Sequence, residues 1–189
     1  MSVGAWSGGW LSRARRSVSP NFGPRPPGID VDLIVVHSIS LPPGEFTGTA
    51  IERLFCNALD FDEHPAYEAI RGLHVSAHFL LRRTGELVQF VSCDDRAWHA
   101  GDSTWRGRSG CNDYSIGIEL EGLAGGDFER VQYDRLADLV ADLAARYPIT
   151  DIAGHEHVAP GRKDDPGAGF DWSRLRRSLR RQRLRFPPP

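Results

Sequence analysis

Val31-Asp32-Leu33-Ile34-Val35-Val36 is a nearly continuous β-branched and apolar run, bounded by Gly28 before it and by Pro42-Pro43 after it. Because its apolar side chains point to both faces, the run predicts a strand that is buried on both sides, as in the sheet of an α/β fold. His37 follows at the C-terminal end, where the sites of such sheets are commonly built. His37 is therefore a candidate metal ligand, although a histidine in this place is more often only a polar strand terminus.

Two helices are predicted to cover this sheet. Residues 49–57 place apolar side chains at helical spacing behind Thr49, a potential N-cap. Residues 129–147 do the same over a longer stretch, with Asp127 as the expected cap and Pro148 as the stop. Between them, residues 76–91 predict a β-hairpin that turns at Thr84-Gly85, with His78 as a core or rim residue.

The composition argues against several classes of function. The chain has 189 residues, which is near the size of one domain, and its 23 basic and 25 acidic side chains leave a net charge of -2. Such a balance provides no positive electrostatic field that would attract nucleic acid. No apolar run is long enough to cross a membrane. The cysteines Cys56, Cys93 and Cys111 are widely spaced and odd in number, which favours a reducing compartment over a disulfide framework. With no signal-peptide pattern at the N-terminus, a cytoplasmic protein is predicted.

One compact domain is expected over residues 29–180. Residues 1–28 are predicted to be an arm that packs on it, with a short helical turn within residues 8–18 and a proline-rich extended part after that. A C-terminal helix has one apolar stripe and many arginines, which fit a solvated face better than an anionic partner. Residues 181–189 end in three prolines and are predicted to be a disordered tail.

The stretch from Gly154 to Gly167 has the composition of a metal-binding loop. His155 and His157 stand near its start, Asp164 and Asp165 near its end, and a Pro-Gly turn lies between them. Folding back at that turn would bring an imidazole and a carboxylate together, as in a catalytic zinc site with three protein ligands and one open position. A solvated polar loop is the alternative. The only lysine of the chain, Lys163, lies inside this stretch and would suit a small developing oxyanion.

Residues 115–122 alternate between apolar and other side chains, which predicts a further strand. One of its faces carries Glu119 and Glu121 beside Gly117, whose lack of a side chain lets something approach closely. This face is a candidate for a general base, and a solvated edge face is the alternative. Trp98-His99 lies in a predicted loop and would form either a platform for a substrate or a cover over the core.

Five strings in order make the chain resemble the cytoplasmic N-acetyl-anhydromuramyl-L-alanine amidases of the AmpD type, from about Gly9 to Leu175. They are residues 35–44 (VVHSISLPPG), 75–78 (VSAH), 96–101 (RAWHAG), 111–122 (CNDYSIGIELEG) and the loop through Asp165-Pro166-Gly167. The resemblance implies a mixed central β-sheet flanked by helices, related to the peptidoglycan-recognition proteins. It also implies an anhydromuropeptide substrate, with no nucleic acid, membrane or obligate protein partner.

The resemblance assigns roles to individual residues. It implies Zn²⁺ held by His37, His155 and Asp165, with Glu119 and Lys163 as catalytic groups. His155 and Asp165, rather than their neighbours His157 and Asp164, match the family's ligand positions. Related phage-type amidases have a cysteine at the third ligand position, so the aspartate supports the cytoplasmic branch. The expected substrate-binding residues are Trp98, His99, Asn112, Arg108 and Arg162.

Two positions depart from the family pattern. Ser38 replaces the asparagine that usually follows the first ligand, and Gly110 stands where an arginine often precedes Cys-Asn-Asp. If that arginine holds a carboxylate of the stem peptide, Arg108 or Arg162 would have to replace it. The predicted reaction is hydrolysis of the amide between the lactyl group of an anhydromuramyl sugar and L-alanine. The alternatives are a non-catalytic muropeptide-binding module and an amidase that acts on intact cell wall.

Overall fold

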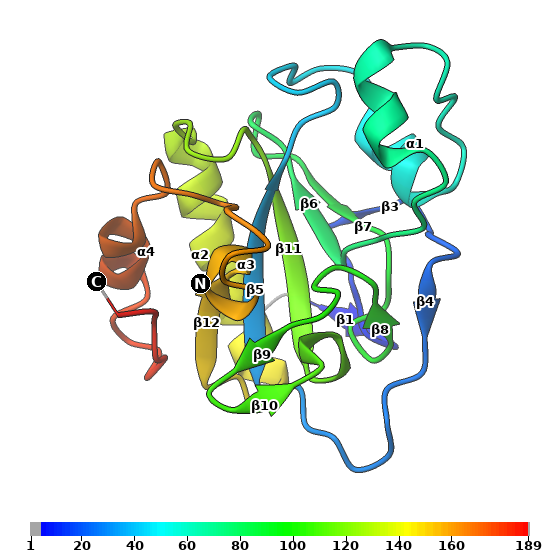
Figure 1. Ribbon diagram of the computed structural model, residues 1–189. Helices are drawn as coiled ribbons and strands as arrows, with labels where there is room; N and C mark the ends of the chain where they lie inside the picture. The colour runs from blue at the N-terminus through cyan, green and yellow to red at the C-terminus, as the bar shows by residue number, and fades with distance from the viewer. Residues whose placement is uncertain (1–4, 189) are drawn as a thin grey trace.

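A computed structural model describes residues 5–188 of the chain. The strands of its central sheet are β3 (Arg15–Arg16), β5 (Leu33–Ile39), β6 (Phe79–Leu81), β7 (Leu87–Gln89), β11 (Ser115–Glu121) and β12 (Asp151–Gly154). Their order across the sheet is β12-β5-β11-β6-β7-β3 (Figure 1). Neighbouring strands run parallel except at the β6–β7 hairpin, so the sheet is mixed.

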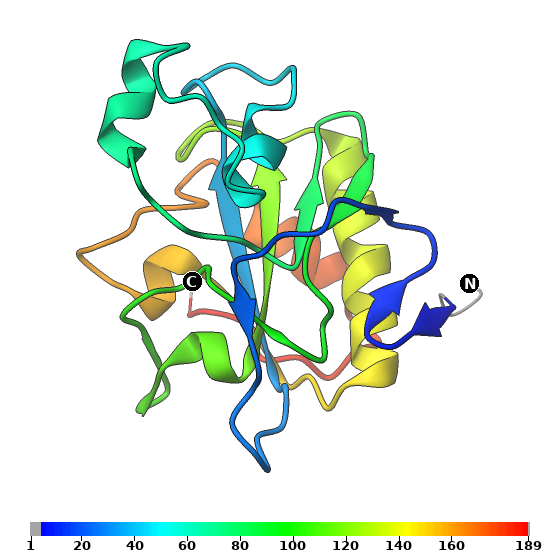
Figure 2. The same ribbon diagram turned by 90° about the vertical axis from the view of Figure 1, so that its right-hand side faces the viewer.

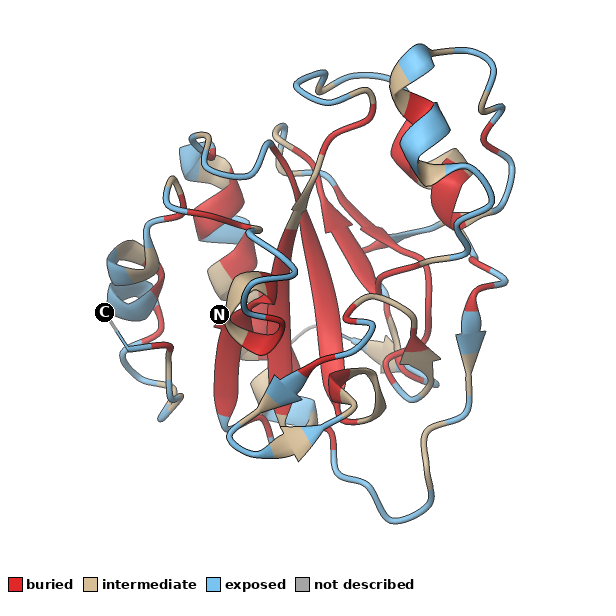
Figure 3. Cartoon of the chain, in the orientation of Figure 1, coloured by how far each residue is buried: buried red, intermediate tan, exposed pale blue. Residues whose placement is uncertain are grey.

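The strand β5 lies inside the sheet, between β12 and β11. Its residues from Leu33 to His37 are buried, as Figure 3 shows for most of the central strands. Ile34 and Val36 join the apolar cluster on one face of the sheet, whereas Leu33 and Val35 join a different cluster on the other face. The predicted burial on both sides is confirmed, and it results from helices and loops that cover both faces.

One face of the sheet is covered by α2 (Arg130–Arg146) and α4 (Trp172–Ser178) (Figure 2). The side chains that pack there from the two helices are Leu136, Leu139, Val140, Leu143 and Leu175, all fully buried. Asp127 was the expected N-cap of α2, and this is wrong. Glu129 caps the helix in a capping box, in which its backbone N–H donates to Oε1 of Gln132 at 2.9 Å.

The opposite face carries shorter elements. They are α1 (Ala50–Phe55), the 3₁₀ helices η1 (Pro65–Ile70) and η2 (Cys111–Asp113), α3 (His155–Val158) and the ribbon of β9 (Thr104–Trp105) with β10 (Arg108–Ser109). Leu54 and Phe55 of α1 pack with Leu80 and Val88 of the hairpin. Thr49 is the N-cap residue of α1, but its side chain makes no capping hydrogen bond. Because these elements are short, this face is not sealed by one long helix.

The N-terminal arm contributes strands to the domain. β1 (Trp6–Ser7) pairs with β2 (Trp10–Leu11), β3 extends the central sheet beside β7, and β4 (Phe22–Gly23) pairs with β8 (Arg96–Ala97). The helical turn predicted within residues 8–18 is wrong, because backbone groups there bond to neighbouring strands instead. Residues 1–4 of the predicted arm lie outside the described residues.

The C-terminal segment runs back along the domain. The Arg185 carbonyl accepts a hydrogen bond from the Ile152 N–H at 3.0 Å, and its guanidinium binds the carboxylate of Asp151. Leu184 and Phe186 pack against the main apolar cluster. The tail was predicted to be disordered, but Leu184, Arg185 and Phe186 within residues 181–188 contact the rest of the domain. Residue 189 lies outside the described part of the chain. No helix among the described residues is long and apolar enough to cross a membrane.

Candidate metal and catalytic site

The site forms where three neighbouring strands carry their chemical groups to the same region. His37 of β5 and Glu119 of β11 are direct partners in the parallel register, and Gly154, the last residue of β12, is the partner of Val36. His155 comes directly after Gly154 and opens α3. His37 and His155, which are 118 positions apart in the sequence, therefore lie side by side, because the carboxyl ends of adjacent parallel strands lie at the same edge of the sheet.

His37, His155 and Asp165 form a compact cluster, within which one ligand atom from each residue lies within 4.8 Å of the others. The Nδ1 atoms of the two histidines are 2.9 Å apart. Asp165 Oδ2 lies 3.3 Å from Nδ1 of His37, and Asp165 Oδ1 lies 3.1 Å from Nδ1 of His155. Two imidazoles and one carboxylate therefore converge on a single point.

The neighbours of two of these residues stay outside the cluster. His155 and His157 lie on the helical turn of α3, where side chains two positions apart diverge by about 200°. His157 Nδ1 accepts a hydrogen bond from the Gly154 N–H at 3.1 Å, and its ring packs against Trp172. A His-x-His pair can chelate one metal from a strand, but the helical turn turns these two side chains apart. Asp164 is exposed.

Glu119 and Glu121 lie in different surroundings. Oε2 of Glu119 is buried and has no hydrogen-bond partner among residues 5–188. Burial first and Asp165 second raise the pKa of this carboxyl well above its usual range. Glu121 accepts hydrogen bonds from Nη1 of Arg82 at 2.8 Å and from the Arg83 N–H at 3.0 Å. β11 is an interior strand that is buried throughout, so the alternative of a solvated edge face is wrong.

A cavity of about 230 Å³ opens beside the cluster. The residues that line it include His37, His155, Asp165, Glu119, Lys163, Trp98 and His99. The Nε1–H of Trp98 is buried and has no hydrogen-bond partner among the described residues. The opposite wall is apolar and comes from β5, α1, η1 and the segments near them: Ile39, Leu41, Leu54, Phe55, Ile70, Leu73 and Val75. This wall could not be predicted from the sequence, since an apolar side chain at helical spacing indicates the core equally well.

His99 lies between the cluster and β11. Its Nδ1 is 2.9 Å from Nε2 of His37, and its Nε2 is 3.2 Å from Oγ of Ser115. A Cβ atom placed on Gly117 would lie 2.4 Å from Cγ of His99. Gly117 was expected to leave room for water and substrate, but the imidazole of His99 occupies that room.

The other predicted substrate-binding residues lie away from this cavity. Asn112 Oδ1 accepts hydrogen bonds from the backbone N–H groups of His99 and Ala100 at 3.1 and 2.8 Å. Arg108 donates to Oδ2 of Asp32 at 2.8 Å and stacks on Tyr114. Both side chains are engaged within the protein.

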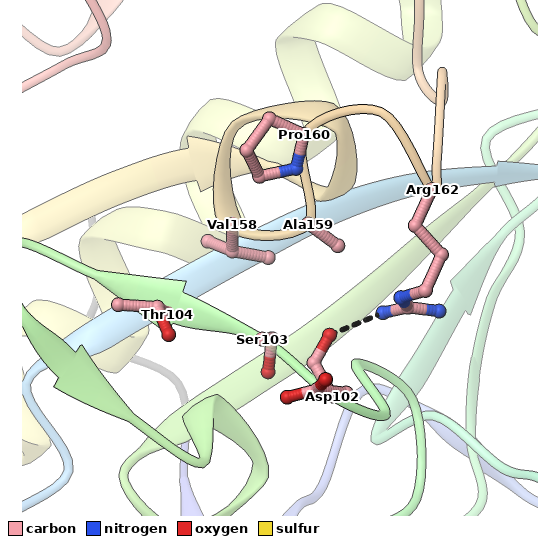
Figure 4. Close-up of a pocket in the computed structure, with 7 residues that line it drawn as sticks. All are labelled: Asp102, Ser103, Thr104, Val158, Ala159, Pro160 and Arg162. Atoms are coloured by element: carbon pink, nitrogen blue, oxygen red, sulfur yellow. Dashed lines mark hydrogen bonds between the residues drawn. The ribbon is translucent and has the colours of Figure 1, made fainter.

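Arg162 lines a second cavity of about 290 Å³ between α3 and residues 102–104. Figure 4 shows its guanidinium turned toward Asp102, where it donates to the backbone oxygen at 2.7 Å. It also bonds the carbonyl oxygen of Ala100.

The two departures from the family pattern have different surroundings. Oγ of Ser38 is buried and has no hydrogen-bond partner in the described part of the chain, and the residue lines the first cavity. Gly110 has a φ of 71° and is the N-cap of η2. This left-handed backbone conformation favours glycine, so any larger side chain there would be strained.

His37 and His99, two buried imidazoles of the site, are held in the neutral form. Burial and the neighbouring His155 lower the pKa of His37 to about 4, although Asp165 acts in the opposite direction. Burial, followed by His37, lowers the pKa of His99 well below its usual value. Asp165 keeps a pKa below its usual range in spite of burial, because the two imidazoles lie beside it. The cluster thus offers a neutral nitrogen of His37 and an anionic oxygen of Asp165 at neutral pH.

The family model for N-acetylmuramoyl-L-alanine amidases matches residues 27–168, the part of the chain that carries this donor set, the carboxylate and the lysine. The chain belongs to this amidase family. It is 51% identical over 170 residues to the 1,6-anhydro-N-acetylmuramyl-L-alanine amidase AmpD of Citrobacter freundii, which covers 89% of this chain and 91% of the relative. The resemblance inferred from the sequence strings is confirmed, and the protein is an enzyme of the amidase class.

Solved structures of amidases and their relatives share the fold. A crystal structure of a selenomethionine AmpD derivative superimposes with a TM-score of 0.89 at 49% identity, covering 92% of this chain and 98% of the other. A peptidoglycan recognition protein, PGRP-LE, matches with a TM-score of 0.62 at 15% identity over 93% of this chain and 97% of the other, a likeness of fold alone. The predicted mixed sheet flanked by helices is confirmed.

Proposed function

We propose that the protein is a zinc-dependent amidase that cleaves the bond between the lactyl group of 1,6-anhydro-N-acetylmuramic acid and L-alanine of the stem peptide. The observation that carries this proposal is the convergence of His37, His155 and Asp165 at one end of the cavity that holds Glu119 and Lys163. A relative that is 51% identical to this chain is named a 1,6-anhydro-N-acetylmuramyl-L-alanine amidase, which supports this substrate. We place the reaction in cytoplasmic recycling of the cell wall, as predicted from the sequence.

The geometry of the cluster fits zinc. Zinc bonds to histidine nitrogen and carboxylate oxygen are about 2.0–2.1 Å long, so tetrahedral ligands lie about 3.3 Å from one another. The three separations between donor atoms in the cluster run from 2.9 to 3.3 Å. Three protein ligands leave a fourth position open, as in catalytic zinc sites. Without a cation, unprotonated nitrogens at this separation would repel each other.

Zinc, when bound, supplies a Lewis acid that polarises the scissile carbonyl and lowers the pKa of water. The protein's own groups must then move one proton and stabilise one charge. Glu119 lies on the strand next to His37, with a carboxylate oxygen free of other partners. In our proposal it takes a proton from the attacking water and passes it to the leaving amine.

Lys163 lies at the rim of the same cavity, two residues before Asp165. Its ammonium group is a compact point charge, and we assign to it the stabilisation of the oxyanion that develops on the scissile carbonyl. The apolar wall opposite, with Leu41 and Leu54 among its members, would exclude water from one side of the substrate. The unpaired Nε1–H of Trp98 would donate a hydrogen bond to the substrate.

Two rival functions predict different products. A non-catalytic muropeptide-binding module would typically lack a ligand or the base, whereas this cavity has both. An amidase of intact wall would release peptide from sacculi. Purified zinc-loaded protein should be incubated with anhydromuropeptide and, separately, with intact sacculi, and the products identified by mass spectrometry.

Release of free stem peptide and anhydromuramyl sugar from the soluble substrate is the expected result, with little release from sacculi. Equal release from sacculi would favour the wall amidase. No release from either substrate, by protein that has bound zinc, would favour the binding module.

A further inference from the structure

His99 has both ring nitrogens engaged, although it is neither a ligand nor an acid or base of the proposed reaction. Nδ1 faces His37 and Nε2 faces Ser115, at 2.9 and 3.2 Å. The ring lies against Gly117, where a side chain would have no room. The missing side chain of Gly117 thus leaves the space in which this imidazole lies, next to His37.

The direction of the hydrogen bonds follows from Ser115. Its hydroxyl donates to the backbone oxygen of Cys111 at 2.6 Å and so uses its single proton. Toward His99 the same oxygen can only accept, which requires the proton of the neutral His99 ring to be on Nε2. Nδ1 of His99 is then an acceptor, and it takes the proton of His37 Nε2.

This chain of bonds decides which nitrogen of His37 is free. With its proton on Nε2, His37 directs an unprotonated Nδ1 at His155 and Asp165. His155 obtains the same tautomer from the next residue, because its Nε2 lies 3.3 Å from the carbonyl oxygen of Ala100. Both bonds come from the segment His99-Ala100, whose backbone N–H groups are held by Oδ1 of Asn112.

We propose that His99 is a positioning residue that fixes the tautomer and orientation of His37 by accepting its Nε2 proton, and that Asn112 holds His99 and Ala100 in place for this role. Outer partners of metal-binding histidines commonly act in this way, and their loss typically costs about 10–100-fold in metal affinity. The proposal rests on the proposed zinc site. It gives His99 a role in building the metal site, in addition to its place in the lining of the cavity.

The first experiment measures zinc affinity of the full chain by competition with a chelator. His99→Phe keeps an aromatic ring but removes the acceptor, and we expect zinc affinity to fall by about 10–100-fold. His99→Asn carries an amide near the position of Nδ1 and should restore much of that loss, whereas His99→Gln, with its amide near the position of Nε2, should not. His74→Gln is the matched control, because His74 is exposed and, of the residues that the structure describes, its ring hydrogen-bonds only to Asn57.

Two results of this series would overturn the proposal. One is wild-type zinc affinity in His99→Phe. The other is an equal loss in the phenylalanine, asparagine and glutamine variants, which would mean that the ring is needed only to fill space. If the wild-type chain itself binds no zinc, the proposed zinc-dependent function is wrong. This result differs from the two above, which contradict only the role of His99.

The second experiment needs no variant. Nitrogen-15 NMR of the imidazoles in the wild-type, zinc-loaded chain reports which nitrogen carries the proton. We expect the proton on Nε2 in His37, His155 and His99. A proton on Nδ1 of His99 would reverse the direction of the bond to His37 and exclude the proposed role, whatever the variants show.

Discussion

Glu119 and Glu121 lie two residues apart on β11, but only Glu119 has a carboxylate oxygen free to act on a substrate. We predict that Glu119→Gln retains the fold and zinc while amidase activity falls by at least about 10²-fold, because the amide cannot take up a proton. Metal analysis and the rate of anhydromuropeptide hydrolysis measure the two parts of the prediction.

Glu121→Gln is the matched control, since Glu121 is bonded to Arg82 and Arg83 rather than directed at the cavity. The amidase activity of Glu121→Gln, divided by the amount of folded protein, should stay close to that of the wild type. An inactive Glu121→Gln with zinc bound, beside a normal Glu119→Gln, would reverse the assignment of the base.

The proposed role of Lys163, stabilisation of the oxyanion, depends on its positive charge. Lys163→Met should bind zinc and substrate nearly normally, yet kcat should fall by about 10²–10³-fold, the usual effect of a missing oxyanion donor. Steady-state kinetics that separate kcat from KM measure this. Wild-type turnover by Lys163→Met would make the lysine a bystander.

At the scale of elements, an ion network joins α1, β6 and β11. Arg82 bonds Glu121 at 2.8 Å and Glu52 at 2.7 Å, and the side chains of Arg82 and Glu121 are 10% and 2% exposed. Glu121→Ala leaves the buried guanidinium with fewer partners, so the free energy of unfolding should fall by about 3 kcal/mol. Urea denaturation measures it. Glu63→Gln breaks an exposed pair with Arg53, and an equal loss there would contradict the role of burial.

The same network gives stability a dependence on pH. Hydrogen bonds from Arg15, and then from Arg82, outweigh partial burial and lower the pKa of Glu52 from 4.5 to about 2. Since the pKa is lower in the folded state, the stabilisation is present above the unfolded value of 4.5 and is lost as the pH falls through about 2. Glu52→Gln should therefore flatten the decrease in unfolding midpoint across that range. If the unfolding midpoint of Glu52→Gln fell with pH as steeply as that of the wild type, Glu52 would not contribute to the pH dependence of stability.

Several elements could be predicted because their signals are local. Apolar runs and alternation indicated β5 and β11, and helical spacing indicated α2. The cap of α2 could not be located in the same way. Asp127 is a preferred N-cap residue and Glu129 is not, and only the contact with Gln132 identifies Glu129 as the cap. The strands of the arm are two residues long and depend on partners far along the chain.

At the scale of the whole molecule, the candidate ligands followed from residue types near strand ends, whereas the choice among them did not. His155 and His157 are equivalent in composition, and only the helical turn of α3 separates them. The apolar wall and the role of His99 depend on which segments meet in space. No local pattern in residues 50–75 indicates that α1 and η1 border the metal cluster.

The domain limits stay a proposal that the contacts support. We propose that the arm within residues 1–28 and the domain over residues 29–180 form one folding unit, because β3 and β4 pair with strands of the domain. The arm also carries Arg25, which donates to the backbone oxygens of Asn112 and Asp113. It thereby contacts the segment that supports His99.

The central claim is that catalysis depends on one zinc held by His37, His155 and Asp165. The most direct measurement is the rate of anhydromuropeptide hydrolysis by chelator-stripped protein as zinc is added back, with bound metal measured in the same samples. Activity should be lost on stripping and return in proportion to zinc, reaching its full value at one ion per chain, while Asp165→Ala binds no zinc and stays inactive. Full turnover by protein shown to contain no metal, or stoichiometric zinc in Asp165→Ala, would contradict the account.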